Sequence, residues 1–243
     1  MVNLPNAITI GRIAMTPFVA LLPFVDSWEL RLLAFVLFIV AAVTDYYDGM
    51  LARSRNLVTT LGQLLDPLAD KLLLVGTLVP MFLLAGGGWS SWGVPPLDLA
   101  DGAALGPVPA PDGGTHFPFV IPFGRIGLPW WVLAVVLGRE LFMTLFRQTA
   151  ARRGVIIAAI GPAKWKTGFQ STWVGAAYFW FFAATLAARE GWTGAPWRAF
   201  AYFNGIVATV TMFVATALTL YSLWLYMRDY GWILRGSRAD NRA

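Results

Sequence analysis

Long apolar segments are the feature that most restricts how this chain can fold. Runs of about 20 mainly apolar residues recur along it, and a helix of about that length is needed to cross a hydrocarbon core roughly 30 Å thick. Hydrophobic residues make up 58% of the 243 residues and charged residues only 13%, about half the charged share of an average soluble domain. This composition argues against a soluble globular protein and against disorder. We therefore predict an all-α, polytopic membrane protein with a single domain over residues 1–243.

Hydropathy places six transmembrane helices in the sequence. Asp26, Ser27 and Trp28 predict a tight turn between the first two helices, and a short polar stretch from Ala52 to Leu61 separates the second from the third. We expect the six helices at residues 8–25, 29–51, 62–86, 130–152, 164–187 and 201–228.

The connection between the third and fourth helices, residues 87–128, is long and rich in glycine and proline. We expect a mostly irregular, extracytoplasmic excursion and assign no chemistry to it. It contains His116, the only histidine of the chain, and the chain has no cysteine. A histidine-based triad, a thiolate nucleophile and a zinc site held by cysteine therefore have little or no support.

The distribution of basic residues predicts the orientation in the membrane, because cytoplasmic loops carry an excess of lysine and arginine. Four basic residues, Arg31, Arg125, Arg189 and Arg198, fall on one side. Eleven fall on the other, which we assign to the cytoplasm together with both termini: Arg53, Arg55, Arg147, Arg152, Arg153, Lys164, Lys166, Arg228, Arg235, Arg238 and Arg242. The predicted location is the inner (cytoplasmic) membrane. The net charge of +5 then matches anionic lipid head groups, and we expect no nucleic-acid partner.

Four carboxylates lie within 26 residues at the cytoplasmic ends of the second and third predicted helices. Asp45 and Asp48 are three residues apart and Asp66 and Asp70 are four apart, so each pair shares a helix face. Carboxylates at such positions are costly and repel one another unless they are protonated or cations lie between them. Oxygen ligands alone suit Mg²⁺ or Mn²⁺. The alternative is four helix-end carboxylates that face water, with Lys71 and Arg53 as counter-ions.

The residues between these pairs favour a phosphate ligand. Gly49 and Gly62 would let a ligand or a helix approach the backbone closely. Arg53 could hold a phosphate through two hydrogen bonds, and Thr59 could donate its hydroxyl to the same ligand. Two metal ions beside an arginine are suited to a pyrophosphate. Taken alone, however, Arg53 would be interpreted as an ordinary cytoplasmic anchor.

The whole stretch is Asp45-x2-Asp48-Gly49-x2-Ala52-Arg53-x8-Gly62-x3-Asp66-x3-Asp70. It resembles the signature of the CDP-alcohol phosphotransferase family at every defined position and spacing. Within that family the chain looks most like the bacterial phosphatidylglycerophosphate synthases. The supporting segments are Asn3-Leu4-Pro5-Asn6 with Thr9 and Arg12, Asp66 to Lys71, Gly138-Arg139-Glu140, and Gly161 to Thr167. The 87–128 connection is longer than this resemblance leads us to expect.

The resemblance implies transfer of the phosphatidyl group of CDP-diacylglycerol to glycerol 3-phosphate, which gives phosphatidylglycerophosphate and CMP. It implies two Mg²⁺ or Mn²⁺ ions bound by Asp45, Asp48, Asp66 and Asp70, with Asp70 also deprotonating the acceptor hydroxyl. The residues implied for the CDP-lipid are Asn6, Thr9, Gly49, Arg53, Thr59 and Gly62. The oligomeric state, a homodimer among the alternatives, stays open.

The acceptor phosphate requires cations, and the fourth and fifth predicted helices supply them. We expect Arg139, Arg147, Lys164 and Lys166 to bind it, within a basic region whose one acid is Glu140. Two alternatives stay open. Arg139 and Glu140 could form an intramembrane ion pair, and the two lysines could serve only to orient the chain.

Two other functions also stay open. The first is the same reaction with inositol phosphate, phosphatidylglycerol or serine as acceptor. The second, more remote, is a cation- or proton-coupled transporter that uses the carboxylates as a relay. The gathering of the acids at one membrane face, and the lack of an evident pair of interrupted helices, disfavour the transporter.

Overall fold

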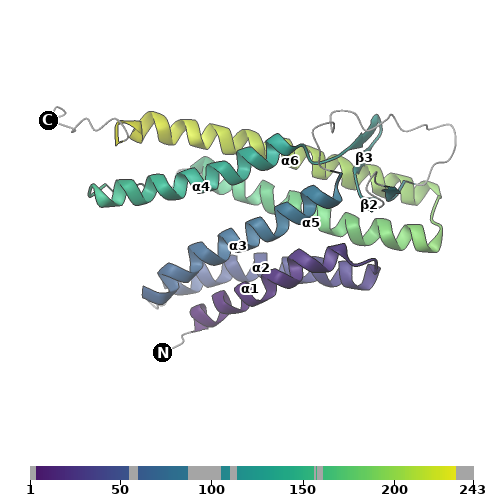
Figure 1. The fold of residues 1–243 in the computed structure, drawn as a ribbon, viewed down its shortest axis with the longest axis horizontal. Coiled ribbons are helices and arrows are strands. Elements are labelled where there is room, and N and C mark those ends of the chain that lie inside the picture. The colour runs from purple at the N-terminus through teal and green to yellow at the C-terminus, as the bar shows by residue number, and fades with distance from the viewer. Residues whose placement is uncertain are drawn as a thin grey trace.

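A computed structural model of the chain describes residues 4–54, 60–86, 105–109, 114–155, 157 and 161–233. Within the helices, the description leaves out the side chains at 4–5, 46–54, 60–61, 63–64 and 162–164. The described residues are mostly helical, as predicted, and Figure 1 shows the long helices side by side in a bundle.

Each of the six predicted segments coincides with one long helix, although the ends differ by several residues. The helices are α1 (Leu4–Leu21), α2 (Trp28–Ser54), α3 (Thr60–Leu84), α4 (Trp130–Arg152), α5 (Gly161–Glu190) and α6 (Ala195–Tyr230). Two short 3-10 helices, η1 (Leu22–Phe24) and η3 (Gly231–Ile233), follow α1 and α6. By length and composition, three described segments could cross a membrane: Asn6–Phe24, Leu65–Leu84 and Ala195–Ile233.

The sequence explains where several helices begin. Pro5, Pro162 and Pro196 each occupy the second position of a helix, where proline has a suitable φ and its missing N–H costs nothing. Ser27 precedes α2 and caps its N-terminus, because its hydroxyl accepts a hydrogen bond of 3.2 Å from the Leu30 N–H. Its carbonyl accepts another, of 3.1 Å, from the Arg31 N–H. The predicted turn between α1 and α2 is thus confirmed.

Helices α1 and α3 run in the same direction and approach closely. A Cβ added to Gly76 on α3 would lie 2.8 Å from Thr16 Cγ2 on α1, so glycine allows this close approach. Tyr178 on α5 joins the pair, with its buried hydroxyl 3.2 Å from the Val19 carbonyl and 3.3 Å from the Gly76 carbonyl. Phe38 on α2 stacks on the Tyr178 ring at a centroid distance of 5.8 Å. These contacts fix α1, α2 and α3 against α5, which also packs along α6.

The described part of the 87–128 connection contains two antiparallel hairpins. They pair β1 (Val108–Pro109) with β2 (Thr115–His116), and β3 (Phe119–Ile121) with β4 (Gly124–Ile126). Figure 1 shows β2 and β3 at the end of the bundle opposite the chain termini.

This connection also contributes to the core, which the sequence analysis did not anticipate. Phe117, Phe119 and Val120 are fully buried, and the Trp180 indole N–H donates a hydrogen bond of 3.1 Å to the Pro118 carbonyl. Strand β3 lies directly on α6 at Gly205, where a Cβ would overlap the Val120 carbonyl. The hairpins therefore brace the ends of α5 and α6.

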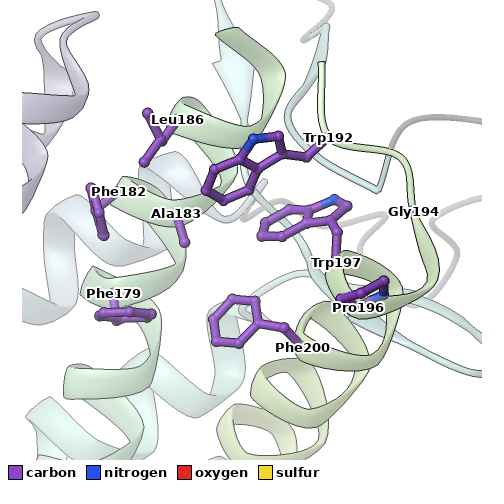
Figure 2. A pocket seen from close by; sticks show the side chains of 9 residues that line it. All are labelled: Phe179, Phe182, Ala183, Leu186, Trp192, Gly194, Pro196, Trp197 and Phe200. Atoms are coloured by element: carbon purple, nitrogen blue, oxygen red, sulfur yellow. The ribbon is translucent and has the colours of Figure 1, made fainter. Parts of the chain in front are cut away.

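An apolar pocket of about 570 Å³ opens between the end of α5 and the start of α6. Figure 2 shows the residues that line it: Phe179, Phe182, Ala183, Leu186, Trp192, Gly194, Pro196, Trp197 and Phe200. The lining carries no charged side chain and no metal ligand, and it lies at the opposite end of α5 from Lys166. This pocket therefore offers no charged group that could bind a metal ion or a phosphate.

Candidate active site

Three of the four predicted metal-binding carboxylates have described side chains, and all three lie at one end of the bundle. Asp45 is two thirds of the way along α2, and Asp66 and Asp70 are in the first half of α3. The end of α2 and the starts of α1 and α3 lie at the same end of the bundle in Figure 1. Asp66 and Asp70 are exposed and Asp45 is half-exposed, so a ligand can reach all three carboxylates.

A buried arginine from α1 joins two of these carboxylates. Arg12 Nη1 contacts Asp45 Oδ1 and also donates to Asp70 Oδ1 at 3.2 Å. The Arg12 side chain is only 2% exposed, whereas Asp45 is 45% and Asp70 58% exposed. The guanidinium therefore lies on the inner side of the two carboxylates, and it brings together predicted site residues from two helices.

The same face of α1 reaches the third carboxylate. The Thr9 hydroxyl donates a hydrogen bond of 2.7 Å to Asp66 Oδ1. Asn6, Thr9, Arg12 and Thr16 are all buried and recur every three or four residues, so they form one polar stripe along an otherwise apolar helix. We call the three aspartates together with Thr9 and Arg12 the acidic site.

The other residues predicted for the donor lie close in sequence to the acidic site. Asn6 is buried on the polar face of α1, and Gly62 is buried in the first turn of α3. Asp48, Gly49 and Arg53 belong to the last turns of α2. The side chains of Asp48 and Arg53, and all of Thr59, lie outside the described residues.

The chemistry of the acidic site suits a hard divalent cation. Among the described side chains there is no group of three or more acidic, histidine or cysteine residues that could hold a metal ion, and the Asp48 side chain falls outside that set. The donors present are carboxylate oxygens, which Mg²⁺ and Mn²⁺ prefer. Arg12 and Thr9 engage one oxygen of each carboxylate, and the accessible part of each carboxylate remains for a ligand.

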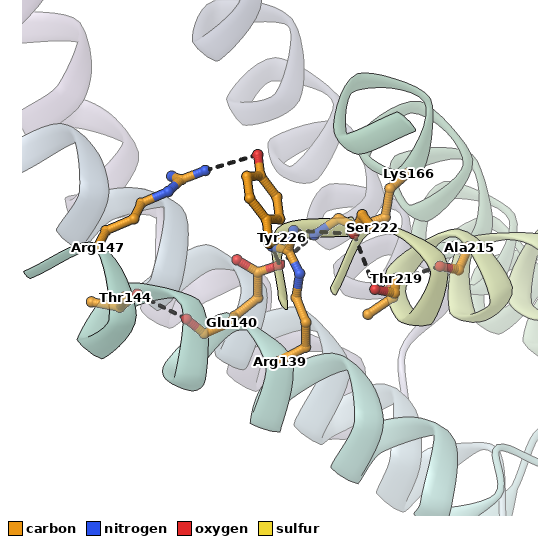
Figure 3. Close-up of polar contacts among 9 residues, drawn as sticks. All are labelled: Arg139, Glu140, Thr144, Arg147, Lys166, Ala215, Thr219, Ser222 and Tyr226. Atoms are coloured by element: carbon orange, nitrogen blue, oxygen red, sulfur yellow. Dashed lines mark hydrogen bonds and ion pairs between the residues drawn. The ribbon is translucent and has the colours of Figure 1, made fainter. Parts of the chain in front are cut away.

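A second polar group, the basic site, lies between α4, α5 and α6, and Figure 3 shows its contacts. At its centre, Glu140 Oε1 accepts a hydrogen bond of 2.8 Å from Arg139 Nη1 and also pairs with Lys166 Nζ. Arg139 and Lys166 are both buried. Arg139 Nη2 donates a further bond of 3.2 Å to the Ser222 hydroxyl on α6. The ion pair between Arg139 and Glu140 that the sequence left open is therefore present, and Lys166 takes part in it.

Tyr226 separates the two arginines of the basic site. Its buried ring lies 6.0 Å from the Arg139 guanidinium carbon and 5.8 Å from that of Arg147. Arg147 Nη2 donates to the Tyr226 hydroxyl at 3.5 Å.

Arg147 is exposed, unlike Arg139 and Lys166. The Lys164 side chain lies outside the described residues. Of the three described cations predicted to bind the acceptor, Arg147 is the most accessible to a ligand from water.

Sequence reasoning did not identify three features of these sites. The sequence supported Arg12 only as one residue of the family resemblance and did not identify it as a partner of the aspartates. Its spacing from Thr9 and Thr16 could have revealed the polar face of α1. Ser222 and Tyr226 on α6 were not singled out, because a serine and a tyrosine in an apolar helix give no signal that points to a partner.

A family profile described as CDP-alcohol phosphatidyltransferase matches residues 2–95 and 114–234. This chain belongs to the CDP-alcohol phosphatidyltransferase family. The family predicted from the aspartate signature is confirmed, and the matched ranges include both the acidic site and the basic site of this family member.

Curated relatives from plants and bacteria match parts of the chain. It is 30% identical over 239 residues to CDP-diacylglycerol–glycerol-3-phosphate 3-phosphatidyltransferase 1, chloroplastic/mitochondrial, of Arabidopsis thaliana, a match that covers 94% of this chain and 62% of the relative. It is 49% identical over 81 residues to the Rickettsia bellii CDP-diacylglycerol–glycerol-3-phosphate 3-phosphatidyltransferase, covering 33% of this chain and 44% of that protein. The probable phosphatidylglycerophosphate synthase of Mycobacterium tuberculosis is 30% identical over 176 residues, covering 71% and 64%. The chain thus spans less than two thirds of each of these three relatives.

Proposed function

We propose that this protein transfers the phosphatidyl group of CDP-diacylglycerol to glycerol 3-phosphate and releases CMP. The observation that carries the proposal is the pairing of an acidic site on α1–α3 with a basic site on α4–α6. The basic site contains three cations and one carboxylate, so its net formal charge of two positives matches a phosphate dianion. Family membership and the names of the relatives support this choice of donor and acceptor.

The aspartates would bind the donor pyrophosphate through divalent cations. Asp45, Asp48, Asp66 and Asp70 would hold two Mg²⁺ or Mn²⁺ ions, which would neutralise charge on the pyrophosphate and on the departing CMP. Asp70 would take the proton from the acceptor hydroxyl, since a carboxylate is the strong base available in this part of the chain. The CDP-lipid contacts proposed from the signature are Asn6, Thr9, Gly49, Arg53, Thr59 and Gly62.

The basic site would hold the phosphate of the acceptor. Arg147 is accessible and would contact the phosphate directly. Glu140 holds Arg139 and Lys166 in place, so these two cations would contribute mainly through the positive electrostatic field that they exert on the bound anion. Lys164, in the first turn of α5, would add a further cation. The acceptor hydroxyl would then form its bond to the phosphorus that carries the diacylglycerol, as the bond from that phosphorus to CMP breaks.

The predicted topology extends this proposal. Six membrane crossings would place the end of α2, the start of α3 and the basic site at the cytoplasmic face, where water-soluble glycerol 3-phosphate is available. The aromatic pocket and the hairpins would then lie toward the other face. Both termini would be cytoplasmic.

An assay of CMP release with a panel of acceptors tests the proposal. The purified protein in detergent, with Mg²⁺ and CDP-diacylglycerol, is given glycerol 3-phosphate, inositol phosphate, serine or phosphatidylglycerol. We expect release to be fastest with glycerol 3-phosphate. Faster release with inositol phosphate would keep the basic site but change the acceptor. A preference for serine or phosphatidylglycerol would contradict the role proposed for the basic site.

A further inference from the structure

Arg12 is the one described cation that contacts the aspartates of the acidic site, and the signature of spaced aspartates does not include it. It comes from α1, whereas its partners Asp45 and Asp70 come from α2 and α3. One buried guanidinium thus joins three helices at the point where two carboxylates meet.

We propose that Arg12 is a positioning residue for metal binding. It contacts Asp45 and Asp70 on their buried side and keeps their accessible oxygens directed toward the metal ions. The inference rests on the metal site of the proposed function. It concerns how this chain assembles that site before any metal arrives.

The burial of the three side chains decides between two roles for Arg12. A guanidinium that took the place of a metal ion would lie on the accessible side of the carboxylates and would have to leave when the metal binds. Arg12 is instead 2% exposed, while its partners are 45% and 58% exposed. The cation therefore occupies the inner side, and the accessible side can receive a metal while Arg12 stays in place.

Electrostatics explains why the chain needs a cation at this position. Two carboxylates that converge from different helices repel each other, and the repulsion grows as burial lowers the effective dielectric constant. A guanidinium is planar, stays charged and offers several donors in a fixed geometry, so Arg12 can contact both carboxylates at once. Thr9 acts in the same sense one turn earlier, through its bond to Asp66.

Arg31 provides a matched control, because it is a second buried arginine in the same bundle. It is 4% exposed, donates to the Pro23 carbonyl at 3.0 Å and contacts the Thr185 hydroxyl. Its guanidinium also lies 4.5 Å from the Phe117 ring centroid. Arg31 therefore braces the opposite end of the bundle, and Arg31→Gln should lower stability without affecting metal binding.

The experiment measures Mn²⁺ affinity directly. The 243-residue chain in detergent is stripped of metal and titrated with Mn²⁺, and free Mn²⁺ is followed by its EPR signal. The proteins compared are wild type, Arg12→Gln, Arg12→Lys and Arg31→Gln. Supporting contacts to metal ligands are typically worth 10- to 100-fold in affinity. We expect Arg12→Gln to bind Mn²⁺ at least about tenfold more weakly, Arg12→Lys to lie between it and wild type, and Arg31→Gln to match wild type.

Several outcomes would overturn the inference. If Arg12→Gln binds Mn²⁺ as tightly as wild type or more tightly, Arg12 is a structural residue or a competitor of the metal. An equal loss in Arg31→Gln would show that general destabilisation explains the effect. If Arg12→Gln cannot be purified, wild-type affinity in Arg12→Lys would contradict the positioning role. Failure of the wild type itself to bind Mn²⁺ would overturn the proposed metal site together with this inference.

Discussion

The acidic site and the basic site are built on the same plan with the charges reversed. In the first, one buried arginine pairs with two of three carboxylates, and in the second, one carboxylate pairs with two of three cations. The third member of each set, Asp66 or Arg147, instead bonds a neutral hydroxyl, that of Thr9 or Tyr226. The formal charges of the described groups are therefore two negative and two positive. The minority charge, Arg12 or Glu140, lowers the repulsion among like charges and fixes their geometry. The excess charge at each site is the basis of the proposal that the first binds metal cations and the second binds a phosphate.

The two sites differ in what their central residue leaves accessible. Arg12 is buried behind half-exposed carboxylates, so the acidic site presents all three of its described carboxylates to a ligand. Glu140 instead binds the two buried cations, Arg139 and Lys166, and leaves Arg147 as the accessible one. The acidic site should therefore depend on all its aspartates together, whereas the basic site should depend most on one arginine.

Removal of divalent cations should have the largest effect of all. The acidic site needs counter-charge before it can accept a pyrophosphate, because carboxylates and phosphates repel each other. Excess EDTA should reduce CMP release to background, and added Mg²⁺ or Mn²⁺ should restore it. Full turnover in excess EDTA would contradict the assignment of the aspartates as metal ligands.

Replacing one aspartate should come next. Asp66→Asn keeps the shape of the side chain and can still accept the Thr9 hydrogen bond, but it removes a charge from the acidic site. We expect kcat to fall by about a hundred- to a thousandfold, the effect of losing one group that stabilises charge at a reacting centre. Asp26→Asn is the control, because Asp26 is 95% exposed at the opposite end of the bundle. Similar rates for the two variants would contradict the assignment.

Glu140→Gln should test whether the single carboxylate of the basic site holds its cations in place. The substitution leaves Arg139 and Lys166 buried without their carboxylate, and removing one partner of a buried ion pair costs roughly 3–5 kcal/mol. Since Glu140 is 26% exposed, we expect a loss near the lower limit, about 3 kcal/mol, measured by chemical unfolding in detergent. Glu29→Gln, which affects an exposed pair with Arg189, should cost much less, because water and salt screen exposed ion pairs. Equal losses would show that Glu140 is not an organising residue.

Tyr226→Phe should have the smallest effect. The substitution keeps the ring between the two arginines and removes only the hydroxyl that accepts from Arg147 at 3.5 Å. One neutral acceptor contributes about 0.5–1 kcal/mol, so the KM for glycerol 3-phosphate should rise about two- to fivefold. Tyr226→Leu also removes the ring and should raise the KM further. If the leucine variant resembles the phenylalanine variant, the ring does not position the arginines.

The sequence predicted the helices and the aspartates for different physical reasons. Long apolar runs determine helices almost independently of tertiary structure, so all six segments were located. The aspartates were found because four carboxylates at fixed spacings are costly in an apolar chain. The location of the connection was predicted, but the packing of Phe117 and Val120 against α5 and α6 was not, because a glycine- and proline-rich segment has no period that reveals its buried face.

The partners of the charged residues could not be predicted from the sequence. Helical spacing places Arg12 on one face with Thr9, but it does not say that α2 and α3 lie opposite that face. Likewise, the sequence favoured a phosphate-binding role for Arg139 and left an ion pair with Glu140 as the alternative. The structure shows the ion pair and adds Lys166, a contact between residues on α4 and α5 that only the packing of these helices determines.

The most direct test of the division between the two sites is the effect of Arg147→Gln on the two Michaelis constants. Charge-assisted contacts to a phosphate are worth about 1.5–3 kcal/mol, so the KM for glycerol 3-phosphate should rise about ten- to a hundredfold. The KM for CDP-diacylglycerol should stay within about twofold of wild type. Arg152→Gln is the control, because this exposed arginine is five residues further along α4 and faces another direction. An equal rise in both constants for Arg147→Gln, or a rise for the donor alone, would contradict a basic site that holds the acceptor.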